Sequence, residues 1–399
     1  MLFTKPGADV AMLIASIQSP CQIPDEIDVV ELRLDLNPDL RHFKSDKPLI
    51  IKSQEISDAQ LGHYFDGDWQ ADLPEHPRII CSRHMDHTPN DLLGVFAELE
   101  KARPNAYIYK LATTAHSTLD SLRMLIATRA LLAEGKRIIG LCMGALGQLT
   151  RIASSTTYVH LGTPTASGQL SFEELSIYKR KSMPWYGLIG DPVAQSHSHI
   201  THNRHCFFVK LQVRKEELAE FFRLAEQLPF AGFAITIPHK EYFGEPINTL
   251  VRAENGWDKH NTDGCGALNV LGPVAGKRIA LLGAGGAGKA IAEKAQREGA
   301  QVTIYNRTPG KVLGVPTKPL SKLEPYDILI NATSCGMLSS DCPLRFEQLR
   351  PSTVVMETIC TPEETTLLKY AKLKNCQLIY GKEMFQAQAA LQFKLWQLV

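Results

Sequence analysis

The stretch KRIALLGAGGAGKAIAEKAQREGAQVTIYNRT, residues 277–308, decides the fold of the C-terminal part of the chain. An apolar strand leads into a glycine turn, a helix follows and ends at Gly299, and a second apolar strand comes next. Gly283, Gly285 and Gly288 form the pattern G-x-G-x-x-G at the start of the helix, where N–H groups and the helix dipole favour a pyrophosphate. Because the pattern lies in a complete strand–helix–strand unit of about 30 residues, it predicts a dinucleotide-binding domain.

The residues after the second strand indicate which dinucleotide binds. An NAD-binding domain usually carries Asp or Glu here, to accept a hydrogen bond from the ribose 2′-hydroxyl. This chain reads Asn306, Arg307 and Thr308 instead. A guanidinium binds a 2′-phosphate and can stack on adenine, whereas a carboxylate would repel that phosphate. The sequence therefore favours NADP, with a surface charge as the alternative role of Arg307.

The composition is that of a folded globular protein of two or three domains. The chain has 399 residues, of which 44% are hydrophobic and 21% charged. Its net charge of +1 gives no reason to expect nucleic acid or an anionic membrane as a partner, and no apolar run reaches the roughly 18 residues of a membrane span. The nine cysteines lack metal-binding spacing, and their odd number suits a reducing compartment. We therefore expect a cytoplasmic protein without a metal site.

Short apolar runs alternate with helical patterns over residues 1–180. Six runs are typical of strands: VAMLIASI, VVELRLDL, PLIIKS, PRIICS, AYIYKLA and RIIGLCMG. This alternation predicts an α/β fold with a parallel sheet. Since the runs lack a glycine loop, a (β/α)8 barrel is favoured over an open sheet. Such a barrel usually takes about 200–250 residues, so either some units are trimmed or loops are missing from the sequence.

Lys110 lies inside the apolar run AYIYKLA, where an ammonium group is costly to bury. A neutral amine, in contrast, is a nucleophile that condenses with a ketone to an imine. We expect an apolar barrel with nearby cations to lower the pKa of Lys110 for this purpose. His84, at the C-terminal mouth of the strand PRIICS, is the candidate acid/base, and His87, further into the loop, is its competitor.

Charged residues also alternate along VELRLDL, which projects Glu31, Arg33 and Asp35 to one face of a strand. Such a face lines a barrel interior that binds a polar ligand, or else forms a purely structural ion-pair network. Arg151 follows the segment GLCMGALGQLT and is a candidate for binding a carboxylate, and Gln169 ends the segment TASGQ.

A separate α/β pattern begins at YGLIG, after the basic linker SIYKRKSMPW. In GDPVAQSHSHITHN the hydroxyls of Ser196 and Ser198 are two residues apart, so in an extended segment both point the same way. The two hydroxyls either bind one oxygen-rich ligand or form capping hydrogen bonds within the loop. In AITIPHK, Thr236 and Lys240 lie on either side of a proline that stops the strand, and HNTDGCG places Asp263 in a turn. A lysine and an aspartate that face one substrate can move a proton as hydride arrives; the alternative for Lys240 is a solvated surface lysine.

Residues 186–399 resemble shikimate dehydrogenases over their whole length. The matching stretches, in order, are GDPVAQSHSH, AITIPHK, INTLV, NTDG, GAGGAG, NRT, NATSCGM and GKEMFQAQAALQF. The resemblance implies that Lys240 and Asp263 are the catalytic pair. It implies that shikimate binds to Ser196, Ser198, Thr236, Asn248, Asp263 and Gln388, and NADP to Gly283, Gly285, Gly286, Asn306, Arg307 and Thr308. Ala234, Cys360 and His199 depart from the family, which usually has Asn, Tyr and Pro there.

The N-terminal part resembles type I 3-dehydroquinate dehydratases. The matching stretches are VELRLD, SRHMD, YIYKLA, LCMGALGQLTRI and SGQ, spread over residues 27–175. The resemblance implies that Lys110 forms the imine and that His84 is the acid/base. It implies that the substrate is contacted by Glu31, Arg33, Arg151 and Gln169. The family's arginine and glycine pair near the third strand are absent from PLIIKSQEIS.

The two resemblances support each other, because the product of the dehydratase, 3-dehydroshikimate, is the substrate of the dehydrogenase. The order of the blocks resembles the chlamydial type of this bifunctional fusion. It implies a barrel at 1–180, a substrate-binding domain at 184–268, a Rossmann NADP domain at 269–380, and a C-terminal helix at 381–399 that returns to the substrate domain. The expected partners are small molecules alone. The alternatives are a ligand-sensing regulator that has lost catalysis and a quinate/shikimate dehydrogenase.

Overall fold

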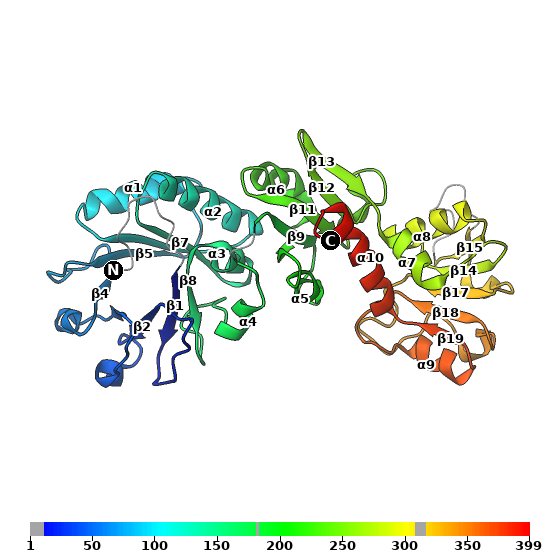
Figure 1. Cartoon of the computed structure of the whole chain (residues 1–399), viewed down its shortest axis with the longest axis horizontal. Coiled ribbons are helices and arrows are strands. Elements are labelled where there is room, and N and C mark those ends of the chain that lie inside the picture. Colours follow the sequence, from blue (N-terminus) through cyan, green and yellow to red (C-terminus); the bar gives the residue numbers. More distant parts are fainter. Residues whose placement is uncertain (1–11, 181–182, 308–316) are drawn as a thin grey trace. The chain divides into compact units, whose positions relative to one another are not determined.

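A computed structural model describes residues 12–180, 183–307 and 317–399. The chain divides at Phe230 into two compact units, and Figure 1 shows the elements of each. In the part of the chain that is described, no helix has the length and apolar character needed to cross a membrane.

The first sheet has eight parallel strands in the order β7-β6-β5-β4-β3-β2-β1-β8 (Figure 1). The strands are β1 Met12–Ile17, β2 Val29–Arg33, β3 Leu49–Lys52, β4 Tyr64–Asp68, β5 Ile79–Met85, β6 Ile108–Thr114, β7 Ile138–Met143 and β8 Thr156–His160. The two ends of this order, β7 and β8, follow each other in the chain, and the sheet forms a near-closed barrel. The expected α/β class and the barrel are confirmed.

The barrel fits into a short stretch because several of its connections are trimmed. The helices are α1 Leu92–Ala102, α2 Thr118–Ala133, α3 Gln148–Ala153 and α4 Phe172–Ser176. The connections after β2 and β3 contain only 3-10 turns, Pro38–His42 and Ile56–Leu61. These short connections account for the small size of the barrel in this chain.

Side chains inside the barrel form two layers along the strands. The layer nearer the amino ends is apolar and is built from Met12, Ile14, Val29, Ile50, Tyr64, Ile80, Ile108 and Ile139. The next layer, toward the carboxyl ends, is polar and contains Ser16, Glu31, Lys52, Asp66, Ser82 and Lys110. Because active sites of such barrels lie at the carboxyl ends of the strands, the polar layer is the candidate site.

A second sheet has the order β10-β9-β11-β12-β13. Its strands are β9 Trp185–Gly190, β10 Phe207–Gln212, β11 Phe230–Ile235, β12 Thr249–Ala253 and β13 Gly256–His260. The associated helices are α5 Ser198–His202 and α6 Leu218–Ala225. Strands β9 and β10 are parallel, whereas β11, β12 and β13 are antiparallel neighbours.

The third sheet is wholly parallel, with the order β16-β15-β14-β17-β18-β19. Its strands are β14 Arg278–Leu282, β15 Gln301–Tyr305, β16 Thr317–Lys318, β17 Ile328–Asn331, β18 Val354–Glu357 and β19 Gln377–Ile379. Helices α7 Asp263–Leu271 and α8 Gly286–Arg297 cover one face, α9 Thr366–Leu373 covers the other, and α10 Gly381–Leu395 follows β19 (Figure 1). Apolar side chains fill both faces, as the Rossmann interpretation requires.

Candidate active sites

Lys110 lies in the polar layer of the barrel beside a fully buried carboxylate. Its Nζ donates to Asp66 Oδ2 at 2.6 Å and lies 3.6 Å from Glu31 Oε1. The other oxygen of Asp66 accepts from Lys52 Nζ at 2.7 Å and from Ser82 Oγ at 2.6 Å. One carboxylate thus joins two lysines inside the barrel.

The surroundings of Lys110 oppose the expected fall in its pKa. Burial alone would lower the pKa of Lys110, but the Asp66 carboxylate, with contributions from Tyr158 and Glu31, raises it above its ordinary value. Burial alone would raise the pKa of Asp66, but Lys110 and Lys52 hold it below its usual range. The expectation of a lowered lysine pKa in an apolar barrel is wrong, because a carboxylate within hydrogen-bond distance outweighs desolvation.

His84 lies on β5, two residues beyond Ser82, so both side chains point to the same side of the sheet. Its imidazole reaches solvent at the open end of the barrel. Loss of hydration, followed by the charges of Lys110 and Lys52, lowers the pKa of His84 to about 4. His84 is therefore neutral at pH 7 and able to accept a proton. His87, the competitor, is exposed and lies 2.7 Å from Asp86 in the loop.

The four predicted substrate contacts of the barrel have different surroundings. Glu31 is buried and accepts a short hydrogen bond from Ser16. Arg33 pairs with both carboxylate oxygens of Asp35 at 2.7 and 2.8 Å. Gln169 Oε1 accepts from the backbone N–H of Thr165 at 2.7 Å, which fixes its amide.

Arg151, the fourth predicted contact, lies on α3 and is 4% exposed. Burial lowers its pKa to about 10. Its Nε has no hydrogen-bond partner among the residues that the structure describes. A buried guanidinium nitrogen without a partner is a donor available to an anionic ligand.

The second unit brings Lys240, Asp263, Asn248 and Gln388 together. Lys240 Nζ donates a short hydrogen bond to Asp263 Oδ2, and Asn248 Nδ2 donates to Asp263 Oδ1 at 2.9 Å. Asn248 Nδ2 also lies 3.3 Å from Gln388 Oε1 on α10. Thr236 follows β11 directly. The arrangement offers a cationic donor, a carboxylate and amides on one side of the unit.

The glycine turn has the geometry that a dinucleotide needs. Gly283 has φ of +101°, which favours glycine, and a Cβ on Gly288 would lie 2.4 Å from the carbonyl oxygen of Gly283. A Cβ on Gly285, in contrast, would meet nothing within 4 Å. The open space at the N-terminus of α8 fits a pyrophosphate. A Cβ on Gly286 would lie 2.9 Å from Lys240 Cβ, so the turn adjoins the lysine.

The three residues predicted to select NADP lie after β15. Asn306 is partly buried and its backbone N–H donates to Lys318 O at 3.1 Å. Arg307 is exposed. Thr308 lies outside the described residues.

Ser196 and Ser198 belong to the first unit. Their hydroxyl oxygens are 2.8 Å apart, and Ser198 begins α5. The two hydroxyl groups therefore lie next to each other and point the same way, as the sequence predicted.

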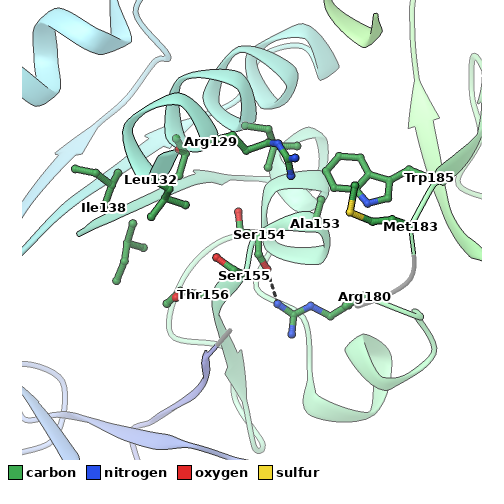
Figure 2. Close-up of a pocket in the computed structure, with 14 residues that line it drawn as sticks. Arg129, Leu132, Ile138, Ala153, Ser154, Ser155, Thr156, Arg180, Met183 and Trp185 are labelled. Carbon is green, nitrogen blue, oxygen red and sulfur yellow. Dashed lines mark hydrogen bonds between the residues drawn. The ribbon is translucent and has the colours of Figure 1, made fainter. Parts of the chain in front are cut away.

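A cavity of about 220 Å³ lies on the outside of the barrel, between α2 and the amino ends of β7 and β8. Figure 2 shows the residues that line it. Arg180 Nη2 donates to the carbonyl oxygen of Ser154 at its edge, at 2.6 Å. None of the site residues predicted from the sequence lines this cavity. Within the three described ranges, no group of three or more His, Cys, Asp and Glu side chains is placed to hold a metal ion.

Two residues of the barrel site were not predicted from the sequence. Asp66 lies on β4, and Tyr158 lies on β8, where its ring centroid is 4.4 Å from Lys110 Nζ. The apolar runs that predicted six strands did not include these two strands. The signal for Asp66 was an aspartate between aromatic residues in YFDGDW, the same kind of isolated charge that pointed to Lys110.

Known proteins resemble both parts of the chain. The family model of type I 3-dehydroquinase matches residues 58–180. The shikimate biosynthesis protein AroDE of Chlamydia pneumoniae is 31% identical, over 96% of this chain and 95% of that protein. The chloroplastic bifunctional 3-dehydroquinate dehydratase/shikimate dehydrogenase of Arabidopsis thaliana is 31% identical, over 80% of this chain and 62% of its own.

The second half also matches solved structures. Shikimate dehydrogenase of Thermus thermophilus, in complex with NADP(H) and shikimate, is 28% identical with a TM-score of 0.50, over 54% of this chain and 94% of that chain. The 3-dehydroquinase model thus matches residues in the first half of the chain, and the dehydrogenase structure matches the second half. The C. pneumoniae relative is similar over both halves. The chain belongs to the AroDE family of bifunctional 3-dehydroquinate dehydratase/shikimate dehydrogenases.

Proposed function

We propose that the chain dehydrates 3-dehydroquinate to 3-dehydroshikimate through an imine with Lys110, and then reduces 3-dehydroshikimate to shikimate with NADPH. The observation that carries the first step is the polar layer of the barrel, in which Lys110 is buried against Asp66 with His84 nearby and neutral. Family membership over both halves supports the pairing of the two reactions.

In the dehydratase reaction, Lys110 gives a proton to solvent water, and the neutral amine attacks the C3 ketone. The ketone oxygen then leaves as water with the return of that proton, which gives a protonated imine. His84 removes a C2 proton, which the imine acidifies by withdrawing electrons, and returns it to the C1 hydroxyl as that group leaves as water. Hydrolysis of the imine releases 3-dehydroshikimate and regenerates Lys110.

Asp66 explains why a raised lysine pKa is compatible with this chemistry. The protonated imine carries its positive charge where the ammonium carried it, so the same carboxylate stabilises both. Asp66 thereby keeps the imine protonated and electron-withdrawing. Arg151, with its unpartnered Nε, is the group we propose for the ring carboxylate, with Arg33, Glu31 and Gln169 around the remaining polar groups.

In the dehydrogenase reaction, Lys240 donates a proton to the oxygen of the ketone as that oxygen gains negative charge. Asp263, hydrogen-bonded to Lys240 and Asn248, holds the ammonium in place, and solvent water returns the proton to Lys240 after the reduction. Bound NADPH supplies the hydride. We propose that shikimate is held by the remaining predicted contacts, Ser196, Ser198, Thr236, Asn248 and Gln388.

The residues present fit NADP. The open space over Gly285, the positive φ of Gly283 and the first N–H groups of α8, at Gly286, form a cradle for the pyrophosphate. We propose that Arg307, with Asn306 and Thr308, holds the 2′-phosphate. The domain bounds 1–180, 184–268, 269–380 and 381–399 belong to the proposal, as does a cytoplasmic location, which is supported by nine free cysteines.

Borohydride trapping tests the proposed imine. The full chain is incubated with 3-dehydroquinate and sodium borohydride, and the modified residue is located by peptide mass spectrometry. We expect a reduced adduct on Lys110 together with loss of dehydratase activity. Full activity after treatment, with Lys110 unmodified, would rule the imine out. Dehydrogenase activity, measured with shikimate and NADP, serves as the control for intact protein.

A further inference from the structure

Tyr158 lies beside the reacting amine and is not yet given a role. It is on β8, paired in register with Ile14, and is 4% exposed. Lys110 Nζ lies 4.4 Å from the centroid of its ring. The phenol is therefore in contact with the nitrogen that attacks the ketone.

The hydroxyl of Tyr158 forms no hydrogen bond of ordinary length in the part of the chain that the structure covers, although the Lys110 ammonium lies close enough to interact with it. Burying such a group without a partner costs free energy, which a bound ligand can recover. Arg151 Nε is a second buried donor without a hydrogen-bond partner. The charge of its guanidinium interacts with Tyr158. Two buried donors without a hydrogen-bond partner, on β8 and α3, are thus close enough to interact electrostatically.

The hydroxyl groups of the polar layer next to Tyr158 are already engaged. Ser16 donates to Glu31, and Ser82 donates to Asp66. Lys52 is held by Asp66 as well. Tyr158 belongs to the apolar layer, in register with Ile14, and its ring lies beside Lys110 Nζ. Its hydroxyl is therefore available to a substrate oxygen at the border of the two layers.

Imine formation needs a donor of this kind. When the amine attacks the carbonyl carbon, the C–N bond forms and the electron pair of the C=O double bond moves to oxygen. That oxygen is one bond from the carbon that joins Nζ, so it lies within reach of groups that touch Nζ. A preorganised donor aimed at a developing oxyanion stabilises the transition state.

We propose that Tyr158 is a further catalytic residue of the dehydratase, whose hydroxyl donates a hydrogen bond to the ketone oxygen as Lys110 attacks. The inference rests on the proposed role of Lys110. Burial raises the pKa of Tyr158 above its ordinary value, so the phenol stays protonated as a donor at neutral pH. The oxygen gains the proton that nitrogen loses on attack, the proton that Lys110 gave to solvent water returns to the same oxygen, and water leaves as the C=N bond forms. Tyr158 ends the step unchanged.

The test compares Tyr158→Phe with the matched control Tyr64→Phe, which alters a buried tyrosine of the apolar layer in the same barrel. Single-turnover mixing with 3-dehydroquinate, quenched by borohydride, measures the rate at which Lys110 is labelled. We expect this rate to fall about a hundred-fold in Tyr158→Phe, the typical loss for one oxyanion donor. Dehydrogenase activity of the same variant should be unchanged, and Tyr64→Phe should label within two-fold of the wild type.

The outcomes separate this inference from the proposed function. A wild-type chain that is never labelled at Lys110 overturns both, whereas equal labelling rates in wild type and Tyr158→Phe overturn the role of Tyr158 alone. If Tyr158→Phe does not fold, 3-fluorotyrosine at position 158 provides a more acidic phenol. The alkaline limb of the labelling rate should then shift to lower pH, and an unshifted limb would contradict the proposal.

Discussion

Single residues decide the charge state of the barrel site, and Asp66 has the largest effect. Its two oxygens hold Lys110 and Lys52 at 2.6 and 2.7 Å, in a layer from which solvent is nearly excluded. Without the carboxylate, two ammonium groups would face each other in the barrel, and both burial and repulsion would disfavour their charges. Asp66 is therefore a positioning residue for the amine.

The substitution Asp66→Asn should lower the pKa of Lys110, because desolvation is then opposed only by Glu31 and Tyr158. Because only the neutral amine attacks, the rate of imine labelling rises with pH as Lys110 loses its proton; we expect this rise to shift toward lower pH and the maximal rate to fall. The matched control is Asp68→Asn, which changes an exposed aspartate of the same strand. A pH profile in Asp66→Asn that coincides with the wild type would show that Asp66 does not set the lysine charge.

The lowered pKa of His84 predicts the pH below which the dehydratase loses its activity. A base with its pKa lowered from 6.5 to about 4 stays neutral, and able to accept a proton, until the pH falls through about 4. The acid limb of kcat/KM should accordingly lie nearer 4 than 6.5. It should be retained in His87→Asn and lost in His84→Asn along with most activity. An acid limb at the ordinary histidine value in the wild type would contradict the assigned environment.

At the scale of elements, the start of α8 offers two glycines with opposite requirements. A Cβ at position 288 would press on the carbonyl oxygen of Gly283, whereas a Cβ at position 285 would enter open space. Gly288→Ala should therefore destabilise the second unit by about 1–3 kcal/mol through overpacking. Gly285→Ala should leave the stability unchanged and raise KM for NADPH, because it narrows the cradle for the pyrophosphate.

Urea unfolding and dehydrogenase kinetics of the two variants check this prediction. If Gly285→Ala binds NADPH as tightly as the wild type, the pyrophosphate does not bind over Gly285. If Gly288→Ala is as stable as the wild type, the close packing of the turn on the helix is not required. Dehydratase activity in both variants should be unaffected.

The elements also show why part of the site could be predicted and part could not. Lys110, His84 and Glu31 lie on strands with long apolar or alternating runs, so their positions on these strands followed from the sequence. Asp66 and Tyr158 lie on β4 and β8, which are five residues each and rich in polar groups, and periodicity does not detect such strands. The pairing of Lys110 with Asp66 joins residues 44 apart, and the pairing of β4 and β6 with the intervening β5 brings them together.

At the scale of the whole molecule, the family and both reactions followed from motifs whose spacing is local. The glycine turn, AITIPHK and NTDG each lie within a few residues, so the sequence carries their chemistry directly. The lysine pKa was wrongly predicted because it depends on a charge from a distant strand, which composition and spacing do not reveal. The domain bounds and individual site roles stay predictions that the variants above address.

The most direct test of the account is the conversion of 3-dehydroquinate to shikimate by the one chain. Purified protein is mixed with 3-dehydroquinate and NADPH, and NADPH oxidation is followed by absorbance while shikimate is measured by chromatography. We predict stoichiometric shikimate formation by the wild type. Lys110→Met should reduce added 3-dehydroshikimate but not use 3-dehydroquinate, and Lys240→Met should stop at 3-dehydroshikimate. Oxidation of NADPH by Lys110→Met on 3-dehydroquinate at the wild-type rate, or no shikimate from the wild type, would contradict the account.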